Sequence, residues 1–357
     1  MKRLLRFGSL IAVVALVAAL FAACSSDSDK DSGSGGDSSG KTKVAFVYVG
    51  PVGDAGWTKK HDDGRKYLQQ QLGDQVETTF LEKVPEGAKS EATFERLARE
   101  GNKVIFATSF GYGDAIFKVA KKYPDVKFEW ATGYKTAKNV GTYFGAAEEG
   151  RYLSGIAAGA ASTSGKIGYV AAFPIPEVLR GINAFTLGAQ SVNPNATVQV
   201  VWTSTWFGPE KEKQAAESLR DAGVDVLSQH QDSPATGQVA EAAGLKWVGY
   251  NDDLERFAPN AWLTASIWDW GPFYVKTVQS EIDGTWKADQ YYGNIADGLV
   301  GLAPFGPSVT QATKDQIAAK EAAIKDGSFA PFTGPIYKQR SEEHTSELQS
   351  QFRISYA

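Results

Sequence analysis

The sequence predicts an α/β fold with two doubly wound lobes joined by a hinge of several crossovers. With 357 residues, the chain exceeds the size that a single hydrophobic core supports comfortably. Strand-like and helix-like segments alternate with short connections, as they do in parallel sheets. An Ala/Gly-rich segment, Glu148–Ala161, separates two such series and suits a tightly packed helix near a crossover. We therefore expect two lobes with a cleft between them.

The first series begins with Val44–Val49, a run of strand formers that breaks at Gly50 and Pro51. A glycine-containing loop follows and leads to a helix-like segment, Asp62–Leu72. The other strands expected in this series are Thr78–Leu81, Lys103–Thr108, Val126–Trp130 and Val140–Phe144. The intervening helices are expected at Ala92–Arg99 and Asp114–Lys122.

The second series repeats the same alternation. Its expected strands are Ile167–Ala172, Val198–Thr203, Val226–Gln229 and Trp247–Tyr250. Its expected helices are Glu177–Ser191, Lys211–Ala222 and Gly237–Ala243. We expect Trp262–Ile267 and Gly271–Ile282 to return to the first lobe, and Tyr291–Phe305 and Gln311–Lys325 to complete the pair. Lobe 1 is thus predicted over about 43–147 and 262–286, and lobe 2 over about 148–261 and 287–339.

Residues 1–24 have the pattern of a lipoprotein signal peptide. Basic residues precede the apolar run Leu10–Ala23, which is too short and wrongly flanked for a stable membrane span. Cys24, the only cysteine, follows this run, which resembles the bacterial signal that is cut before a cysteine that then carries acyl chains. Residues 25–42 are mostly Ser, Asp and Gly and predict a disordered linker. We therefore expect an exported domain tethered to a membrane.

The C-terminal segment does not fit the rest of the chain. Arg340–Ser350 reads RSEEHTSELQS and resembles the translation of a widely used DNA sequencing adapter. We interpret 340–357 as an artefact of sequence assembly and exclude it from fold reasoning. We expect this segment to be exposed and unpacked, and the true sequence beyond Gln339 to be missing.

Composition and motifs argue against several classes of function. The net charge of −4 disfavours nucleic acid, which needs a basic surface. No internal stretch is apolar enough to span a membrane. The glycines after the first strand form no dinucleotide or phosphate-loop motif, and no GxSxG elbow is present. His61 lacks a second histidine nearby for a metal, and His230 with Asp232 lacks a nucleophile. We expect no enzyme activity, no cofactor and no metal.

Aromatic and polar residues recur where the predicted strands end. These strand-end groups are Asp54 and Trp57; Ser109 to Tyr112; Thr205 to Phe207; Gln229 to Asp232; Asn251 to Asp253; and Trp268 to Trp270. The carboxyl ends of parallel strands line the ligand crevice of open α/β sheets. A single such aromatic is more often part of a core, but recurrence at one topological position predicts a binding cleft.

The chain from Lys43 to about Gln339 resembles the BMP (basic membrane protein) family of substrate-binding lipoproteins for ABC transporters. This is the purine-nucleoside-receptor-like branch of the type I periplasmic binding proteins. The segments that carry the resemblance are GPVGDAGWTKKHDDGR, TSFGYGDA, KFEWATGYKT, EEGRYLSG, PEVLRGINAFTLGAQSVNP, TSTWFGP, QHQDS and FTGPI. They span nearly the whole mature domain and look closest to members that bind free purine bases such as adenine.

The resemblance implies a site in which one aromatic from each lobe stacks on the base. The matching positions are Trp57 and Trp206. Trp268 stands where nucleoside receptors have a ribose-binding lysine, and Asn251 stands where they have an aspartate. Both departures suggest a site that need not bind ribose. Further candidate ligand contacts are Phe110, Tyr112, Asp232, Asp253 and Trp270.

A flat purine suits two indole faces. Stacking contributes about 1–3 kcal/mol per base and aromatic face, and micromolar binding needs about 8 kcal/mol, so hydrogen bonds must complete the site. Asp232 or Asp253 could accept from an exocyclic amino group, and Tyr112 could donate to a ring nitrogen. We predict a monomer that delivers the base to an ABC permease. The alternatives are a nucleoside- or sugar-binding protein of the same fold, and a ligand-sensing lipoprotein that partners a receptor.

Overall fold

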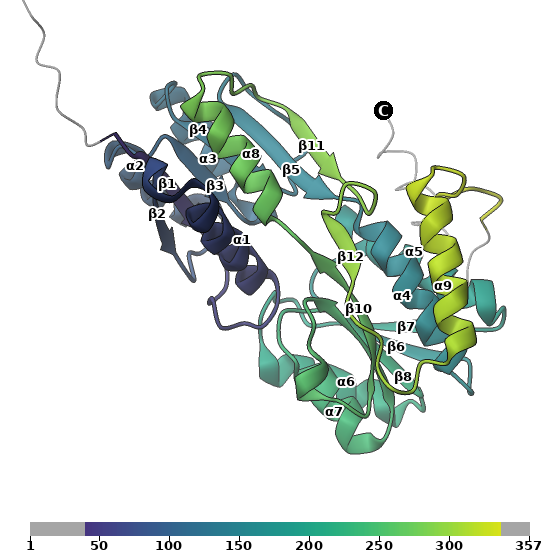
Figure 1. Cartoon of the computed structure of the whole chain (residues 1–357). Helices are drawn as coiled ribbons and strands as arrows, with labels where there is room; N and C mark the ends of the chain where they lie inside the picture. The colour runs from purple at the N-terminus through teal and green to yellow at the C-terminus, as the bar shows by residue number, and fades with distance from the viewer. Residues whose placement is uncertain (1–39, 337–357) are drawn as a thin grey trace, which may run out of the picture. The chain divides into compact units, whose positions relative to one another are not determined.

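The computed structural model describes residues 40–336 (Figure 1). Within this range, two six-stranded sheets carry helices on both faces, which confirms the predicted α/β class with two doubly wound lobes. None of the helices in this range combines the length and the apolar character that crossing a membrane requires. The predicted signal peptide with Cys24, nearly all of the linker and residues 340–357 lie outside the described residues.

The sheet of the first lobe has the strand order β11-β5-β4-β3-β1-β2, and all its pairs are parallel. Its strands are β1 (Thr42–Val47), β2 (Val76–Leu81), β3 (Val104–Ala107), β4 (Lys127–Ala131), β5 (Val140–Gly145) and β11 (Gln290–Gly293). Its helices are α1 (Trp57–Leu72), α2 (Glu91–Arg99), α3 (Gly113–Lys122) and α8 (Gly271–Ile282). Alternate residues of β1 explain the two covered faces. Phe46 packs in the core that includes α1 and α8, whereas Val47 packs with α2 and α3 (Figure 1).

The sheet of the second lobe has the order β12-β10-β9-β8-β6-β7, with only the edge strand β12 antiparallel. Its strands are β6 (Lys166–Ala171), β7 (Thr197–Trp202), β8 (Val226–His230), β9 (Lys246–Asn251), β10 (Trp262–Trp268) and β12 (Val300–Leu302). Its helices are α4 (Ala147–Ala161), α5 (Pro176–Val192), α6 (Pro209–Asp221), α7 (Ala235–Ala243) and α9 (Gln311–Lys325). In Figure 1, α6 and α7 cover one face, and α4, α5 and α9 lie on the other.

The described chain passes between the sheets at three places: from β5 into α4, from β10 into α8, and from β11 into β12. The sequence-based division of lobes differs here. Residues 262–268 were assigned to lobe 1, but β10 pairs with β9 in the second sheet. Residues 290–293 were assigned to lobe 2, but β11 pairs with β5 in the first. Periodicity reveals a strand without saying which sheet it joins, and this is why the assignment failed.

Helix α1 begins at Trp57, five residues before the predicted Asp62. The cause is the buried carboxylate of Asp54, which accepts hydrogen bonds from the backbone N–H groups of Gly56, Thr58 and Lys59 at 2.8–3.0 Å. These amides have no partners within a helix, so a carboxylate placed before them extends the helix toward the first strand. Trp57 is thereby fixed on a regular helix rather than on a loose loop.

Helices α4 and α5 are in contact at the level of their backbones, as the Ala/Gly-rich sequence of α4 predicts. A methyl group built on Gly155 would lie 2.1 Å from the carbonyl oxygen of Phe185. One built on Gly188 would lie 2.0 Å from the carbonyl oxygen of Tyr152. No side chain can fit at either position, so these glycines set the separation of the two helices next to the crossover.

We expect Gly188→Ala to force α4 and α5 apart and to lower the free energy of unfolding by about 1–3 kcal/mol, the usual cost of overpacking. Gly181→Ala on the same helix is the matched control, because its nearest neighbours lie at 3.7 Å. There the change should be neutral or stabilising, since Ala is favoured over Gly in a helix by about 1 kcal/mol. Scanning calorimetry tests the pair, and equal melting temperatures for the two variants would contradict the packing described.

Candidate functional site

The carboxyl ends of strands from both sheets meet at one cavity between the lobes. Its atom-free space, including the open mouth, is about 390 Å³. The lining residues are Val49, Trp57, Ser109, Phe110, Thr132, Glu177, Trp206, His230, Asp232 and Tyr250. They come from strand ends, from the loops that follow them and from the starts of α1 and α5. Four candidates named from the sequence are therefore in the lining: Trp57, Phe110, Trp206 and Asp232.

Trp57 forms the first-lobe wall of the cavity, and its ring is held on several sides. The indole Nε1 donates to the carbonyl oxygen of Thr108 at 2.7 Å. The ring stands edge-on to Trp268 and to Trp270, with centroid separations of 6.0 and 5.6 Å and interplanar angles of 84° and 79°. With its polar edge satisfied inside the protein, the ring offers the cavity an apolar surface.

A stack of three rings lies behind Trp57. Trp268 and Trp270 are stacked at 4.8 Å, and Trp270 is stacked on His61 at 4.9 Å. The Trp268 Nε1 donates to the Asn251 Oδ1 at 3.0 Å. Burial lowers the pKa of His61 well below its ordinary value, so this ring is neutral at pH 7. Trp268 and Trp270, named from the sequence as ligand contacts, thus support Trp57 and are not part of the lining.

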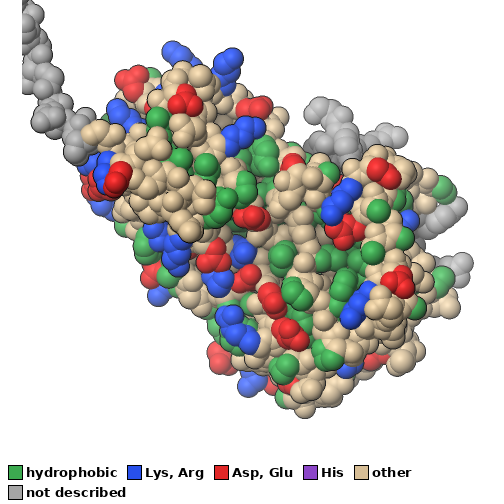
Figure 2. Space-filling model, viewed as in Figure 1, with side chains coloured by type: hydrophobic (Ala, Val, Ile, Leu, Met, Phe, Trp, Pro, Cys, Tyr) green, Lys and Arg blue, Asp and Glu red, His purple; other side chains and the backbone are tan. Residues whose placement is uncertain are grey.

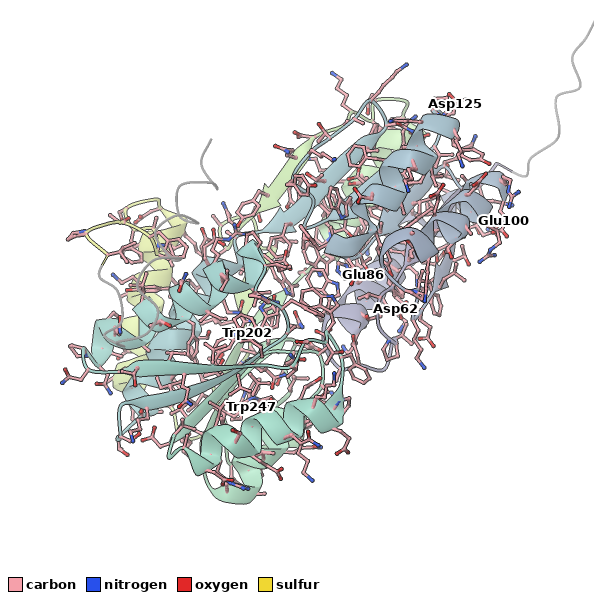
Figure 3. All side chains as sticks on the ribbon, turned by 180° about the vertical axis from the view of Figure 1, so that it is seen from behind. Asp62, Glu86, Glu100, Asp125, Trp202 and Trp247 are labelled. Atoms are coloured by element: carbon pink, nitrogen blue, oxygen red, sulfur yellow. The ribbon has the colours of Figure 1, made fainter. Side chains whose placement is uncertain are left out.

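Trp206 forms the wall contributed by the second lobe, from the loop between β7 and α6. Its ring contacts Phe173 at 4.9 Å, and its Nε1 donates to the Glu86 Oε2 at 3.3 Å. Glu86 belongs to the first lobe, where its other oxygen accepts from Ser109 and Gly111 (Figure 3). The described aromatic pairs include none between Trp57 and Trp206, and both indoles line the same cavity.

Asp232 is a buried carboxyl of the lining. Its Oδ1 accepts from the Asn251 Nδ2 at 3.0 Å and from the backbone N–H of Trp57 at 3.4 Å. Burial raises the pKa of Asp232 well above its ordinary value, and the nearby carboxylates of Asp54 and Glu212 add to this effect. Asn251 is buried behind Asp232 and links it to Trp268, so it orients the site from outside the lining.

Two further sequence candidates lie away from the cavity. Tyr112 is buried against Phe94, and its hydroxyl donates to the carbonyl oxygen of Val84 at 2.7 Å, so that donor is already used. Asp253 accepts from the backbone N–H of Glu255 at 3.1 Å and so closes a local turn. We therefore assign neither residue a ligand contact.

The ligand contacts named from the sequence omit several polar residues of the lining, among them His230 and Glu177. From the sequence, His230 belongs to the strand-end group Gln229 to Asp232 and is weighed as a catalytic group, whereas Glu177 is only part of a predicted helix. Burial raises the pKa of Glu177 to about 8, against the opposing charge of Arg180. The signal for His230 was available in principle, because it ends β8, whereas Glu177 lies in the first turn of α5, six residues after the end of β6.

The backbone around the site holds several residues in an uncommon conformation. Positive φ values occur at four non-glycine residues in loops or strand ends near the cavity: Ala55, Thr132, Ser204 and Asn251, with φ of 66°, 60°, 55° and 71°. Each costs free energy that the surrounding contacts must offset, and such residues cluster at binding sites.

On the face shown in Figure 2, charge gives no sign of a polyanion-binding surface. Basic and acidic side chains are interspersed there. Among the described residues, no group of three or more His, Cys, Asp or Glu side chains is arranged to hold a metal ion. The cavity thus combines the aromatic rings of Trp57, Phe110 and Trp206 with two carboxyls and one imidazole in its lining.

Known proteins resemble this chain over most of its length. Residues 41–332 match the family model Bmp, described as ABC transporter substrate-binding protein PnrA-like. The chain is 51% identical over 303 residues to a purine-binding protein of Brucella abortus, covering 85% of this chain and 86% of the relative. It is 44% identical over 319 residues to a putative ABC transporter glucose-binding protein of Haloferax volcanii, covering 89% and 81% respectively.

Solved structures support the fold. A solute-binding protein of an ABC transporter system from Aeropyrum pernix superposes with a TM-score of 0.71 at 18% identity, covering 80% of this chain and 92% of that one. One from Conexibacter woesei gives a TM-score of 0.65 at 20% identity, covering 81% and 98%. The two-lobed architecture is therefore that of the type I periplasmic binding proteins.

The buried carboxyl of Asp232 should make the stability of the folded protein depend on pH. Its folded-state pKa is raised, so the folded protein loses stability as the pH rises from the ordinary carboxyl pKa near 4 toward the raised value. Asp232→Asn removes this loss and keeps an oxygen that accepts from Asn251. We expect the variant to melt above the wild type at pH 8, with a gap that closes toward pH 4.

Thermal melts between pH 4 and pH 8 measure this gap. Asp125→Asn, at an exposed position, is the matched control and should follow the wild-type profile (Figure 3). A constant difference between Asp232→Asn and wild type across this range would contradict the prediction.

Proposed function

Because the chain belongs to the Bmp family of ABC transporter substrate-binding proteins, we propose that its ligand is a purine base. The base is captured outside the cytoplasmic membrane and delivered to the permease of the transporter. The observation that carries this proposal is the pair of indoles, Trp57 and Trp206, which reach one cavity from different lobes. The named ligand class of the Brucella relative, at 51% identity, supports the same choice.

A purine fits the chemistry of this slot. Two indole faces, each contributing about 1–3 kcal/mol of stacking, would supply part of the roughly 8 kcal/mol that micromolar binding needs. Phe110 adds a third aromatic surface to the lining. The carboxyls of Asp232 and Glu177 and the imidazole of His230 are available to the polar edge of the base. No covalent step is part of this function.

Capture requires the lobes to close, and contacts between them support a closed form. Gly56 of the first lobe lies so near the second that a methyl group on it would be 2.7 Å from the Asp232 Cα. The Lys59 Nζ lies 2.7 Å from the Asp252 Oδ2, and the Lys60 Nζ lies 3.5 Å from its Oδ1. Only the closed arrangement makes these contacts, so they favour it when a ligand fills the slot.

A sugar is the second candidate ligand, because the Haloferax relative is named a putative glucose-binding protein. Indole faces also stack on pyranose rings. Isothermal titration calorimetry with adenine, hypoxanthine, guanine, adenosine, ribose and glucose separates the possibilities. Tight binding of glucose or ribose with no purine binding would overturn our proposal.

The same function places the protein on the membrane surface through acyl chains at Cys24. Mass spectrometry of the membrane fraction tests this anchor.

We expect Trp57→Ala and Trp206→Ala each to weaken adenine binding at least about tenfold, since one stacked face is worth about 1.4 kcal/mol or more. Trp202→Ala is the matched control. Trp202 is a tryptophan of the second lobe that is 37% exposed and does not line the cavity (Figure 3). Calorimetry measures affinity, and circular dichroism checks the fold. Unchanged affinity in both cavity variants would place the ligand elsewhere.

Gly56→Ala should hold the lobes apart and weaken adenine binding at least about tenfold, because the backbone of Asp232 cannot yield as a side chain does. Gly53→Ala in the same loop is the control, since a methyl group there meets nothing within 4 Å. Calorimetry gives the affinities, and small-angle X-ray scattering with adenine present shows whether the variant closes. Wild-type affinity in Gly56→Ala would show that closure does not need this contact.

A further inference from the structure

A buried arginine lies beneath the cavity and has an unusual set of partners. The Nη1 of Arg151, on α4, donates to the carbonyl oxygen of Gln229 at 2.9 Å, and its guanidinium carbon lies 3.4 Å from the Tyr250 ring centroid. Arg151 is fully buried, and its Nε has no hydrogen-bond partner among the described residues. No described carboxylate lies within ion-pair distance of it. A positive charge is thus held in the protein by a carbonyl group, aromatic rings and one imidazole.

The imidazole is that of His230. The Nη2 of Arg151 lies 3.4 Å from its Nδ1. A guanidinium can only donate hydrogen bonds, so Nδ1 must be the acceptor and the proton of the neutral ring must be on Nε2. Burial lowers the pKa of His230 well below its ordinary value, and the charge of Arg151 lowers it further, which excludes the doubly protonated ring at pH 7. The His230 tautomer is therefore fixed by the protein.

The Nε2 of His230 has no hydrogen-bond partner among the described residues, and His230 lines the cavity. The other polar groups there are less constrained. The carboxyls of Glu177 and Asp232 only accept hydrogen bonds when ionised but can also donate when protonated. His230 can only donate from Nε2. The hydrogen-bonding direction of this nitrogen is thus fixed before a ligand arrives.

We propose that His230 determines specificity by donating from Nε2 to a ring-nitrogen lone pair of the bound purine. Arg151 is the positioning residue that fixes the tautomer. This inference rests on the proposed function, because it takes a purine as the ligand. A base that turns an N–H group toward Nε2 meets donor against donor and leaves both unpaired, which disfavours it. The histidine thus selects the orientation of the base as well as its identity.

Adenine analogues test the donor directly. In 1-deaza-, 3-deaza- and 7-deazaadenine, one ring-nitrogen lone pair is replaced by a C–H group. We expect one of the three to bind wild type at least about fivefold more weakly than adenine, since it leaves the Nε2–H unpaired. In His230→Ala that penalty should vanish while the other two analogues keep their wild-type ratios to adenine. His230→Gln, which retains a donor, should recover part of the penalty.

The outcomes separate this inference from the proposed function. If wild type binds none of the purines, both fail. If wild type binds adenine but the penalties are the same in His230→Ala, or no analogue is penalised, only the role of His230 fails. A titration in which His230→Ala weakens all four ligands by one common factor would likewise show a structural role.

The tautomer has a test that needs no variant. In protein labelled with ¹⁵N-histidine, the two ring nitrogens of His230 give different chemical shifts when one is protonated. We expect the spectrum of ligand-free wild type to show the proton on Nε2 and to remain unchanged between pH 6 and pH 8. A proton on Nδ1 would overturn the proposal. Arg151→Met, if it folds, should give a mixture of tautomers.

Discussion

The site depends on the packing of Trp57 against the stacked rings of Trp268, Trp270 and His61. Trp268 ends β10 in the second sheet, and Trp270 precedes α8, which packs on the first sheet. The stack therefore stands on the crossover between the lobes, and one wall of the cavity rests directly on it. Because ring contacts fix both position and tilt, any change in this crossover would be felt at the Trp57 face. The ligand wall and the hinge are thus one packed unit.

The chemistry of the cavity follows from how its charged groups are buried. The carboxylates of Asp54 and Glu212 lie close enough to Asp232 to raise its pKa. No described basic side chain forms an ion pair with Asp232. Arg151 is the converse case, a cation without a carboxylate partner. Separating these charges leaves the cavity with a donor of fixed direction on His230 and with unpaired carboxyls, rather than with a neutralised ion pair. Such an arrangement suits a neutral, polar and flat ligand better than a charged one.

Much of this architecture could be predicted from the sequence. The alternation of patterns located the strands and helices, and the rule that ligands bind at strand ends pointed to Trp57 and Trp206. The same rule could not decide which residues at the strand ends line the cavity and which are buried behind its wall. Trp268 and Trp270 also follow a strand, but they pack behind the wall. Tyr112 turns into the core, because the helix that follows β3 begins there. The sequence places His230 at a strand end but cannot show its contact with Arg151, which lies 79 positions earlier in the chain.

The close approach of Gly56 to the backbone of Asp232 has a consequence for how this binding slot could diversify. Two main-chain segments act as a mechanical stop, so the thickness of the closed slot is set independently of the side chains that line it. Substitutions among those side chains can alter which edge groups are recognised while every ligand still meets a gap of the same width. The main chain would then select for flat molecules, and the side chains would select among them, so the two kinds of selectivity could change separately.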